Sequence, residues 1–245
     1  MEPKKLTIGH LFPDLLNLYG DRGNMITLQN RLRWRGLEAE VKTFEKDDAI
    51  DFSELDIVFL GGGSDREQLL VCERLKALRS EVAAFVESNG VLMAVCGGYQ
   101  LLGHYYKLKN ETIEGLSILD IYTESGEGRL IGNVVIESDM TGEKELFVGF
   151  ENHGGRTHIG SHTPFGKVLY GHGNNGEDTT CGVVYKNVLG TYLHGPLLPK
   201  NPKLADYLLA CALRRKYGEP IELPPLDDTA EQAAHDYIVK RFLQA

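Results

Sequence analysis

The residue best placed to do chemistry is Cys96, which follows the apolar segment Val91–Val95 and precedes Gly97-Gly98 and a helical pattern. A sharp turn from a strand into a helix pushes one side chain out of the sheet, and neighbouring glycines tolerate the tight backbone. The N-terminus of the following helix favours negative charge and so stabilises a thiolate. The sequence therefore predicts a nucleophile at Cys96, whereas Cys72 and Cys211 lie inside helical patterns typical of small buried residues.

A thiolate nucleophile needs a base, which is normally a histidine held within reach by the fold. Of the eight histidines, His194 ends a predicted strand over 188–193 and is followed by Gly195-Pro196, which stops that strand. Functional groups gather at the carboxyl ends of strands in α/β sheets, and Cys96 and His194 both follow such ends. His194 is therefore the predicted base.

A third strand end, at Leu60, opens into three glycines that precede a helical pattern. Backbone N–H groups in such a loop can face a developing oxyanion, and each donor contributes about 2.7–4 kcal/mol to the transition state. Because this loop would lie at the same edge of the sheet as the turn at Cys96, it is interpreted as part of the same site.

These three strand ends belong to a regular alternation of strand and helix patterns in the first half of the chain. Such alternation implies right-handed crossovers and a doubly wound α/β sheet. The fully apolar strand before Cys96 indicates burial on both faces of a parallel sheet. The predicted strands are 6–12, 39–44, 56–60 and 91–95, and the predicted helices are 14–35, interrupted near Gly20 and Gly23, and 65–88.

After about residue 110, glycine-rich turns separate short runs of Val, Ile and Phe, a pattern typical of antiparallel or mixed strands. No linker-like tract divides the chain, so one domain over 1–220 is predicted, with a C-terminal extension helix (221–245) packed on it after the proline-containing segment 222–225. The predicted strands are 130–137, 145–150, 182–185 and 188–193, and the predicted helices are 202–217 and 229–243.

Composition excludes several classes of protein. The 26 basic and 35 acidic residues give a net charge of −9, which disfavours general nucleic-acid binding. The longest unbroken apolar stretch, 207–213, is far shorter than the ~20 residues of a membrane span, and no secretory h-region is visible at the start. Four cysteines without a C-x-x-C pair predict free thiols in a reducing cytoplasm.

Cofactor motifs are weak in this sequence. No phosphate-binding P-loop occurs, and the G-x-G-x-x-G string at 171–176 leads into a strand pattern rather than a helix. His158 and His162 have a spacing that could supply two metal ligands, but no acidic or thiol partner completes the set. The sequence therefore predicts neither a nucleotide nor a metal in this chain.

Taken together, the glycine triplet, the motif Cys-Gly-Gly-Tyr-Gln at 96–100 and the strand-end histidine resemble class I glutamine amidotransferases. Segments 10–12, 16–21, 61–67, 118–120 and 150–157 are similar to the cobyric-acid-synthase-like (CobB/CobQ) branch, in particular to the glutaminase subunits of lipid II isoglutaminyl synthases. The resemblance covers the chain from about residue 6 to the last helix. It implies a flavodoxin-like three-layer α/β/α fold with a mostly parallel central sheet and added mixed strands.

The resemblance also assigns residues to roles. Cys96 would attack the side-chain amide of glutamine and form a γ-glutamyl thioester, while His194 would move the thiol proton to ammonia and then activate water. Gln100 would reach the substrate region, and Arg129 would pair with the α-carboxylate of glutamine. The oxyanion N–H donors would be those of Gly62, Gly63 and Gly97.

The third member of a triad stays open. Most class I members carry a glutamate two residues after the catalytic histidine, and this chain has Pro196 there, a loss that the branch shares. Asp21 is the first candidate to orient His194, because it lies in a motif that distinguishes the branch, and Glu151 is the second. A Cys–His dyad without a third member is the remaining alternative.

The resemblance further implies a partner. Cobyric acid synthases join this module to an N-terminal ATP-using domain, whereas this sequence begins at the amidotransferase module. We therefore expect a heterodimer with a separate Mur-ligase-like subunit resembling MurT, which would receive ammonia, amidate D-glutamate of lipid II, and hold the ATP and any metal. The alternatives are a stand-alone cysteine γ-glutamyl hydrolase, a cobyrinate-type amidotransferase subunit and a non-enzymatic scaffold.

Overall fold

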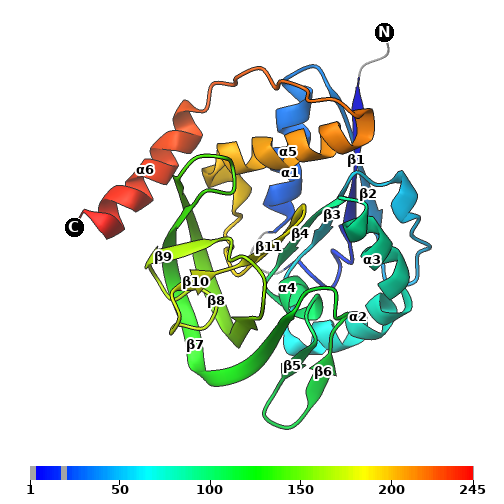
Figure 1. Cartoon of the computed structure of the whole chain (residues 1–245), viewed down its shortest axis with the longest axis vertical. Helices are drawn as coiled ribbons and strands as arrows, with labels where there is room; N and C mark the ends of the chain where they lie inside the picture. Colours follow the sequence, from blue (N-terminus) through cyan, green and yellow to red (C-terminus); the bar gives the residue numbers. More distant parts are fainter. Residues whose placement is uncertain (1–3, 18–20, 245) are drawn as a thin grey trace.

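The computed structural model describes residues 4–17 and 21–244, and its strands form two sheets flanked by helices (Figure 1). Residues 18–20 of the motif at 16–21 lie outside the described residues.

The central sheet has the strand order β11-β12-β4-β3-β1-β2. The five strands from β12 to β2 run parallel, and β11 pairs antiparallel with β12 at one edge. Every residue of β3, β4 and β12 is buried, as expected for apolar strands covered on both faces. The strands are β1 (Lys5–Leu11), β2 (Glu38–Phe44), β3 (Ile57–Leu60), β4 (Val91–Val95), β11 (Val183–Tyr185) and β12 (Val188–Thr191).

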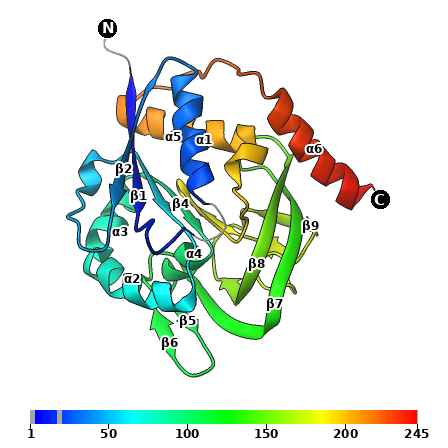
Figure 2. The ribbon, with the colours of Figure 1, turned by 180° about the vertical axis from the view of Figure 1, so that it is seen from behind.

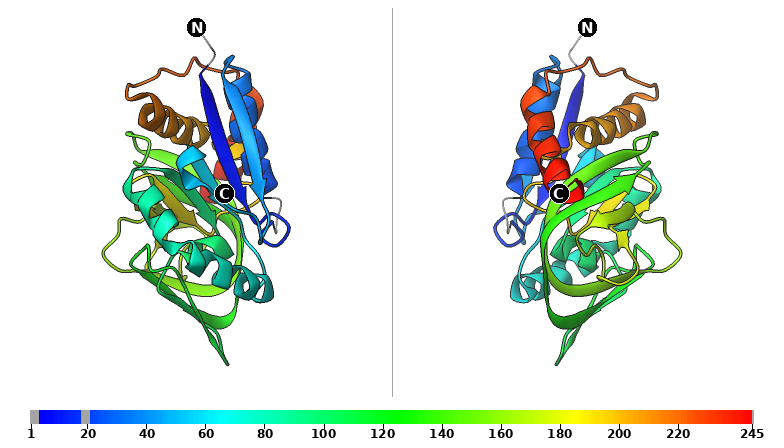
Figure 3. Two further views of the ribbon diagram at one scale, coloured as in Figure 1. Left: turned by 90° about the vertical axis from the view of Figure 1, so that its right-hand side faces the viewer. Right: turned by 90° about the vertical axis from the view of Figure 1, so that its left-hand side faces the viewer.

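Helices cover both faces of this sheet, with α1 and α5 on one side and α2 and α3 on the other (Figures 1 and 3). The predicted three-layer α/β fold is therefore confirmed. The helices are α1 (Arg22–Arg33), η2 (Phe52–Glu54), α2 (Asp65–Ala77), α3 (Arg79–Glu87), α4 (Gly97–Leu101), η3 (Leu198–Lys200), α5 (Pro202–Tyr217) and α6 (Thr229–Leu243).

The second sheet is built around a long antiparallel hairpin, β7–β8, which curves below the central sheet (Figures 1 and 2). The hairpin loses register between the pairs Ser125↔Gly155 and Leu130↔His153, so residues 126–129 of β7 bulge out opposite Gly154 alone. The strands are β5 (Tyr105–Lys107), β6 (Thr112–Glu114), β7 (Ile121–Ser138), β8 (Glu145–Ile159), β9 (Gly166–Tyr170) and β10 (Thr180–Cys181).

Two predicted helices differ from those observed. The helix predicted over 65–88 is two helices, because buried Leu78 leaves the helical conformation (φ −100°, ψ 9°) between α2 and α3. The helix predicted over 14–35 begins only at Arg22, since Phe12 has φ 53° and its carbonyl closes a turn with Leu16. The helix after Cys96 ends at Leu101, where the chain turns back into β5.

The C-terminal segment lies along the hairpin through few contacts. His235 of α6 bonds to the carbonyl of Leu146 at 2.9 Å, and the rings of Phe242 and Tyr170 lie 4.6 Å apart. None of the residues of α6 is buried. The division of the chain at residue 220 stays a prediction.

A buried ion-pair cluster ties this segment to the central layers. The Arg31 guanidinium of α1 donates to Asp206 of α5 at 2.7 Å and to Asp228, the residue before α6, at 2.5 Å. Arg35 also donates to Asp206, at 2.6 Å. Two carboxylates and two guanidinium groups thus form one cluster, in which both arginine side chains are almost fully buried.

Among the helices that the structure describes, none has the length and apolarity needed to span a membrane.

Candidate active site

Cys96 lies at a strained turn between β4 and α4. Its backbone has φ 52° and ψ −108°, a region that residues other than glycine rarely adopt, at an energetic cost of about 1–3 kcal/mol. The Cys96 N–H donates to the carbonyl of Thr191 at 2.8 Å, and the Cys96 carbonyl accepts from Gln100 at 3.0 Å. A Cβ on Gly98 would lie 2.5 Å from the carbonyl oxygen of Leu60, so the elbow needs glycine there. The observed turn has the sharp strand-to-helix geometry that was predicted, and the role of Cys96 as nucleophile stays a prediction.

His194 is fixed by its backbone three residues after β12. Its N–H donates to the carbonyl of Phe150 at 2.7 Å, and the N–H of Phe150 donates back to the His194 carbonyl at 3.2 Å. This bridge joins the end of the central sheet to the hairpin of the second sheet. The His194 side chain is fully buried.

Cys96, His194 and Asp21 converge around Gly62. A Cβ on Gly62 would lie 3.0 Å from Cys96 Cβ, 3.4 Å from His194 Cε1 and 3.6 Å from Asp21 Oδ2. Asp21 Oδ1 is 3.5 Å from His194 Nδ1, and both side chains are inaccessible to solvent. Three residues from distant parts of the sequence therefore meet at the carboxyl ends of the parallel strands.

The electrostatics of this group favour a protonated imidazole. Burial acts to lower the pKa of His194, but hydrogen bonding and charge attraction from Asp21 and Cys96 outweigh it and raise that pKa to about 9. His194 therefore holds its proton at neutral pH. An imidazolium beside a cysteine favours the thiolate, which is the reactive form of a cysteine nucleophile.

Glu151, the second candidate for the third member, binds elsewhere. Its carboxylate accepts from the N–H and Nδ1 of His172 at 2.7 and 2.6 Å and from the N–H of Gly173 at 2.9 Å. His153 Nε2 is 3.7 Å away. Burial acts to raise the pKa of Glu151, but its interactions with His153 and His172 outweigh burial and lower that pKa overall. Glu151 holds the turn at 172–173, and Asp21 is the carboxylate beside His194.

The three glycines assigned to the oxyanion differ in what their N–H groups contact. The N–H of Gly62 donates to Asp21 Oδ2 at 2.9 Å. The N–H groups of Gly63 and Gly97 have no acceptor among the residues that the structure describes. An oxyanion could therefore be bound by Gly63 and Gly97 as the site stands, whereas Gly62 would first have to leave Asp21.

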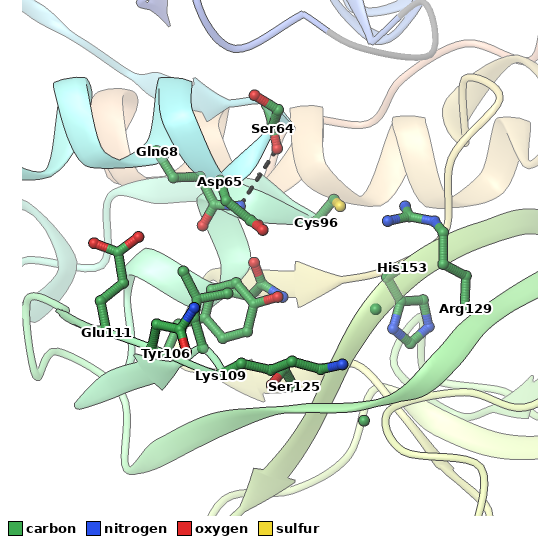
Figure 4. A pocket seen from close by; sticks show the side chains of 16 residues that line it. Ser64, Asp65, Gln68, Cys96, Tyr106, Lys109, Glu111, Ser125, Arg129 and His153 are labelled. Carbon is green, nitrogen blue, oxygen red and sulfur yellow. Dashed lines mark hydrogen bonds between the residues drawn. The ribbon is translucent and has the colours of Figure 1, made fainter.

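A pocket of about 530 Å³ opens in front of Cys96 (Figure 4). Gln100 lines it and is held by a hydrogen bond from its Nε2 to the Tyr192 hydroxyl at 2.9 Å. His194 does not line the pocket and is fully buried. A substrate would therefore reach Cys96 from the pocket while the imidazole stays shielded.

Arg129 reaches the same pocket from the bulge of β7. Its Nε donates to Asn152 Oδ1 and its Nη2 to the Asn152 carbonyl, both at 2.7 Å. Nη1 has no hydrogen-bond partner among the described residues. The guanidinium is thus oriented by one neighbour and keeps donors available for a ligand.

Several pocket residues were not predicted from the sequence. Asp65 and Gln68 come from the start of α2, where Ser64 and Glu67 form a capping box. That S-x-x-E spacing is the signal that could have placed this helix start beside the site. Tyr106 comes from the three-residue strand β5, which is too short to show a pattern. Further lining residues are Lys109, Glu111, Ser125 and His153.

The two histidines with metal-like spacing are engaged separately. His158 stacks on Tyr122, with ring centroids 4.9 Å apart, and His162 Nε2 accepts from the N–H of Asp120 at 2.8 Å. No group of three or more His, Cys, Asp or Glu side chains in the described part of the chain is arranged to hold a metal ion.

Comparison with known proteins places this site in a known context. Residues 7–202 match the family model of the CobB/CobQ-like glutamine amidotransferase domain. The chain is 47% identical to a protein of Staphylococcus aureus (strain N315) named lipid II isoglutaminyl synthase (glutamine-hydrolyzing) subunit GatD, over 97% of this chain and 96% of that protein. It is 40% identical to the protein of the same name from Streptococcus pneumoniae (strain ATCC BAA-255 / R6), over 96% and 91%.

Solved structures agree at the level of the fold. A crystal structure of a glutamine amidotransferase superposes with a TM-score of 0.53 at 18% identity, covering 84% of this chain and 98% of that one. The glutaminase domain of Trypanosoma brucei CTPS, with bound acivicin, superposes with a TM-score of 0.50 at 10% identity, covering 89% and 96%.

Proposed function

Because the chain belongs to the CobB/CobQ-like glutamine amidotransferase family, we propose that it is the glutaminase subunit of a lipid II isoglutaminyl synthase. It hydrolyses L-glutamine and supplies ammonia to a Mur-ligase-like partner resembling MurT, which uses ATP to amidate D-glutamate of lipid II. The relatives from Staphylococcus and Streptococcus are named as that subunit, and the similarity extends over nearly their whole length. The observation that carries the proposal is Cys96, placed between an open pocket and the buried His194–Asp21 pair.

The first half of the reaction forms a thioester. The Cys96 sulfur attacks the side-chain amide carbon of glutamine, and the carbonyl oxygen becomes an oxyanion facing the N–H groups of Gly63 and Gly97. When this tetrahedral intermediate collapses, the C–N bond breaks. His194 gives its proton to the departing nitrogen, so ammonia leaves and a γ-glutamyl thioester remains on Cys96.

The second half releases glutamate. His194, now neutral, takes a proton from a water molecule as that water attacks the thioester carbonyl. The C–S bond then breaks, and Cys96 returns as a thiolate beside protonated His194. Asp21 stabilises the imidazolium in both halves, because its carboxylate stays 3.5 Å from Nδ1. One water and one glutamine are consumed for each glutamate and ammonia formed.

Substrate recognition is assigned to residues of the pocket wall. Arg129 pairs with the α-carboxylate of glutamine through the donors that Asn152 leaves available. Gln100 contacts the substrate near the sulfur from its place beside Tyr192. The chain itself uses no cofactor, and ATP with any metal belongs to the partner. The proposed location of the complex is the cytoplasm, and the four free cysteines support it.

The glutaminase half is tested by measuring glutamate released from L-glutamine, with the chain alone and with its partner. We expect Cys96→Ser to lose at least about 10³-fold in rate. A glutamine analogue with a diazoketone group, such as diazo-oxonorleucine, should label Cys96 covalently. Undiminished turnover in Cys96→Ser would overturn the assignment. Hydrolysis of γ-glutamyl peptides that is indifferent to the partner would favour a stand-alone hydrolase.

The synthase half is tested by the source of nitrogen. The complex carrying Cys96→Ser should amidate lipid II when ammonium chloride is supplied and fail when only glutamine is supplied. The wild-type complex should use both. Failure of the wild-type complex to amidate lipid II, together with amidation of a cobyrinate-type acceptor, would reassign the partner reaction and leave the glutaminase assignment intact.

A further inference from the structure

We infer that Asp65 is a specificity-determining residue that pairs with the α-ammonium group of the substrate, beside Arg129, which pairs with the α-carboxylate. The inference rests on the proposed glutaminase function and extends it, since it explains how the pocket recognises a free amino acid. Asp65, Cys96 and Arg129 all line the one pocket that opens in front of the sulfur. Figure 4 shows Cys96 between the other two in that view.

Free glutamine carries two opposite charges close together. The α-ammonium and α-carboxylate groups of glutamine are attached to the same carbon atom. Any protein groups that bind them must therefore be adjacent and of opposite sign. Arg129 is close enough to Asp65 to act on it electrostatically, and it is the only cation found to do so among the described residues. Tyr106 lines the same pocket and interacts electrostatically with Asp65, Cys96, Arg129 and Arg156.

The Asp65 carboxylate is available to bind a ligand. Asp65 is the first residue of α2, and the cap of that helix is made by its neighbours Ser64 and Glu67 instead. Its carboxylate has no hydrogen bond or ion pair at contact distance within the described residues. Burial in the pocket raises the pKa of Asp65, and Arg129 only partly opposes this. An incoming ammonium would restore the stabilisation that a charged carboxylate lacks there.

Glu111 is a second carboxylate that lines the pocket, and its surroundings differ from those of Asp65. Glu111 lies in the turn between β5 and β6, next to Lys109, which has the opposite charge. Neither residue acts appreciably on Asp65. Arg129 acts on Asp65, so a group bound by Asp65 can share a carbon atom with a group bound by Arg129. The geometry selects Asp65 for the ammonium.

The consequence is selectivity for free glutamine. A peptide-linked glutamine has no charged α-amino group, so it would leave Asp65 desolvated and without a partner. A site that binds a charged group rejects analogues lacking it more strongly than a purely apolar site can. This arrangement would protect protein and peptide amides from hydrolysis by Cys96.

The test uses glutamine and its analogue without the α-amino group, 4-carbamoylbutanoate, with the assembled complex. Ammonia release gives kcat/KM for each, and their quotient is the selectivity ratio. We expect a wild-type ratio of at least about 100, and a decrease of at least about tenfold in Asp65→Asn, mainly through KM for glutamine. Glu111→Gln, the matched pocket carboxylate, should change the ratio by less than about twofold.

If Asp65 had a purely structural role at the helix start, its replacement would change kcat/KM equally for both substrates and leave the selectivity ratio unchanged. That result in an active Asp65→Asn or Asp65→Ser variant would overturn this inference alone. If either variant is too slow to assay, glutamine binding is compared in Cys96→Ala with and without Asp65→Asn by calorimetry. Equal affinities there would also overturn it. A wild-type complex that releases no ammonia from glutamine would overturn the proposed function and this inference together.

Discussion

The Asp21 carboxylate lies 3.5 Å from Nδ1 of His194 through one oxygen, while its other oxygen accepts the N–H of Gly62 at 2.9 Å. One side chain therefore connects the imidazole to the glycine loop beside Cys96. In most class I glutamine amidotransferases the orienting carboxylate comes two residues after the histidine, whereas here it comes from the residue that precedes α1. The relationship makes Asp21 the carboxylate whose loss should affect the imidazole directly.

Replacement of Asp21 by asparagine keeps the shape of the side chain and removes its charge. We expect kcat/KM for glutamine to fall by about 10²-fold, because the imidazolium loses its partner. The alkaline limb of the pH–rate profile should move to lower pH, since Asp21 is one cause of the high pKa of His194. Glu151→Gln is the control, and its alkaline limb should stay near that of wild type. An unmoved limb in Asp21→Asn would show that Asp21 does not act on His194.

Stability should depend on pH through His194. Its pKa in the folded protein is about 9, above the ordinary value of 6.5, so folding favours the protonated form. The resulting stabilisation is complete below about pH 6.5 and is lost as the pH rises through about 9. Urea unfolding between pH 6 and 10 measures this trend. The slope over this range should be smaller in His194→Asn, and equal slopes in the two proteins would contradict the prediction.

The strained backbone at Cys96 should reverse the usual order of glycine and alanine. At φ 52° glycine is unstrained, so we expect Cys96→Gly to be more stable than Cys96→Ala by about 1 kcal/mol. Both variants should lack glutaminase activity. Cys72 in α2 provides the control, because glycine in a helix interior should be less stable than alanine by about 1 kcal/mol. Chemical denaturation of the four variants measures their free energies of unfolding. The same order of the glycine and alanine variants at both positions would contradict backbone strain at Cys96.

The buried guanidinium of Arg31 should contribute strongly to stability. Arg31→Ala leaves Asp206 and Asp228 without one of their partners, and we expect a loss of about 3 kcal/mol in the free energy of unfolding. Arg33→Ala, at an exposed position of the same helix, should change it by less than about 0.5 kcal/mol. The folded fraction of Arg31→Ala should retain kcat, since the cluster is remote from Cys96. Stability equal to that of Arg33→Ala would count against the cluster.

Sequence patterns predicted the elements whose apolar residues are continuous or regularly spaced. The strand before Cys96 and the helices at 202–217 and 229–243 were predicted with the observed bounds, because they are long or fully buried. The strands β5, β6 and β10 were not predicted, and the predicted strands 130–137 and 145–150 missed residues 121–129 of β7 and 151–159 of β8. β5, β6 and β10 have two or three residues each, so their existence depends on pairing with distant segments rather than on their own pattern.

The site residues likewise divide into those that a local sequence pattern predicts and those whose position depends on distant segments. Cys96 and His194 could be proposed from strand ends, because parallel strands bring their carboxyl ends together whatever the intervening chain does. Asp21 entered only through a resemblance, since nothing in its local pattern indicates that it faces His194. Asp65 lies at a helix start that a capping box marks, yet its approach to Arg129 depends on how far the bulge of β7 reaches across the pocket.

That bulge has a consequence of its own. Residues 126–129 lie outside the paired ladder of β7 and β8, so the three residues before Arg129 can vary in length and composition while every paired residue of the hairpin keeps its register. Cys96 belongs to the other sheet, and His194 is bridged to the hairpin at Phe150, within the paired part of β8. Related enzymes can therefore differ in the residues that surround Arg129 while the positions of Cys96 and His194 stay the same.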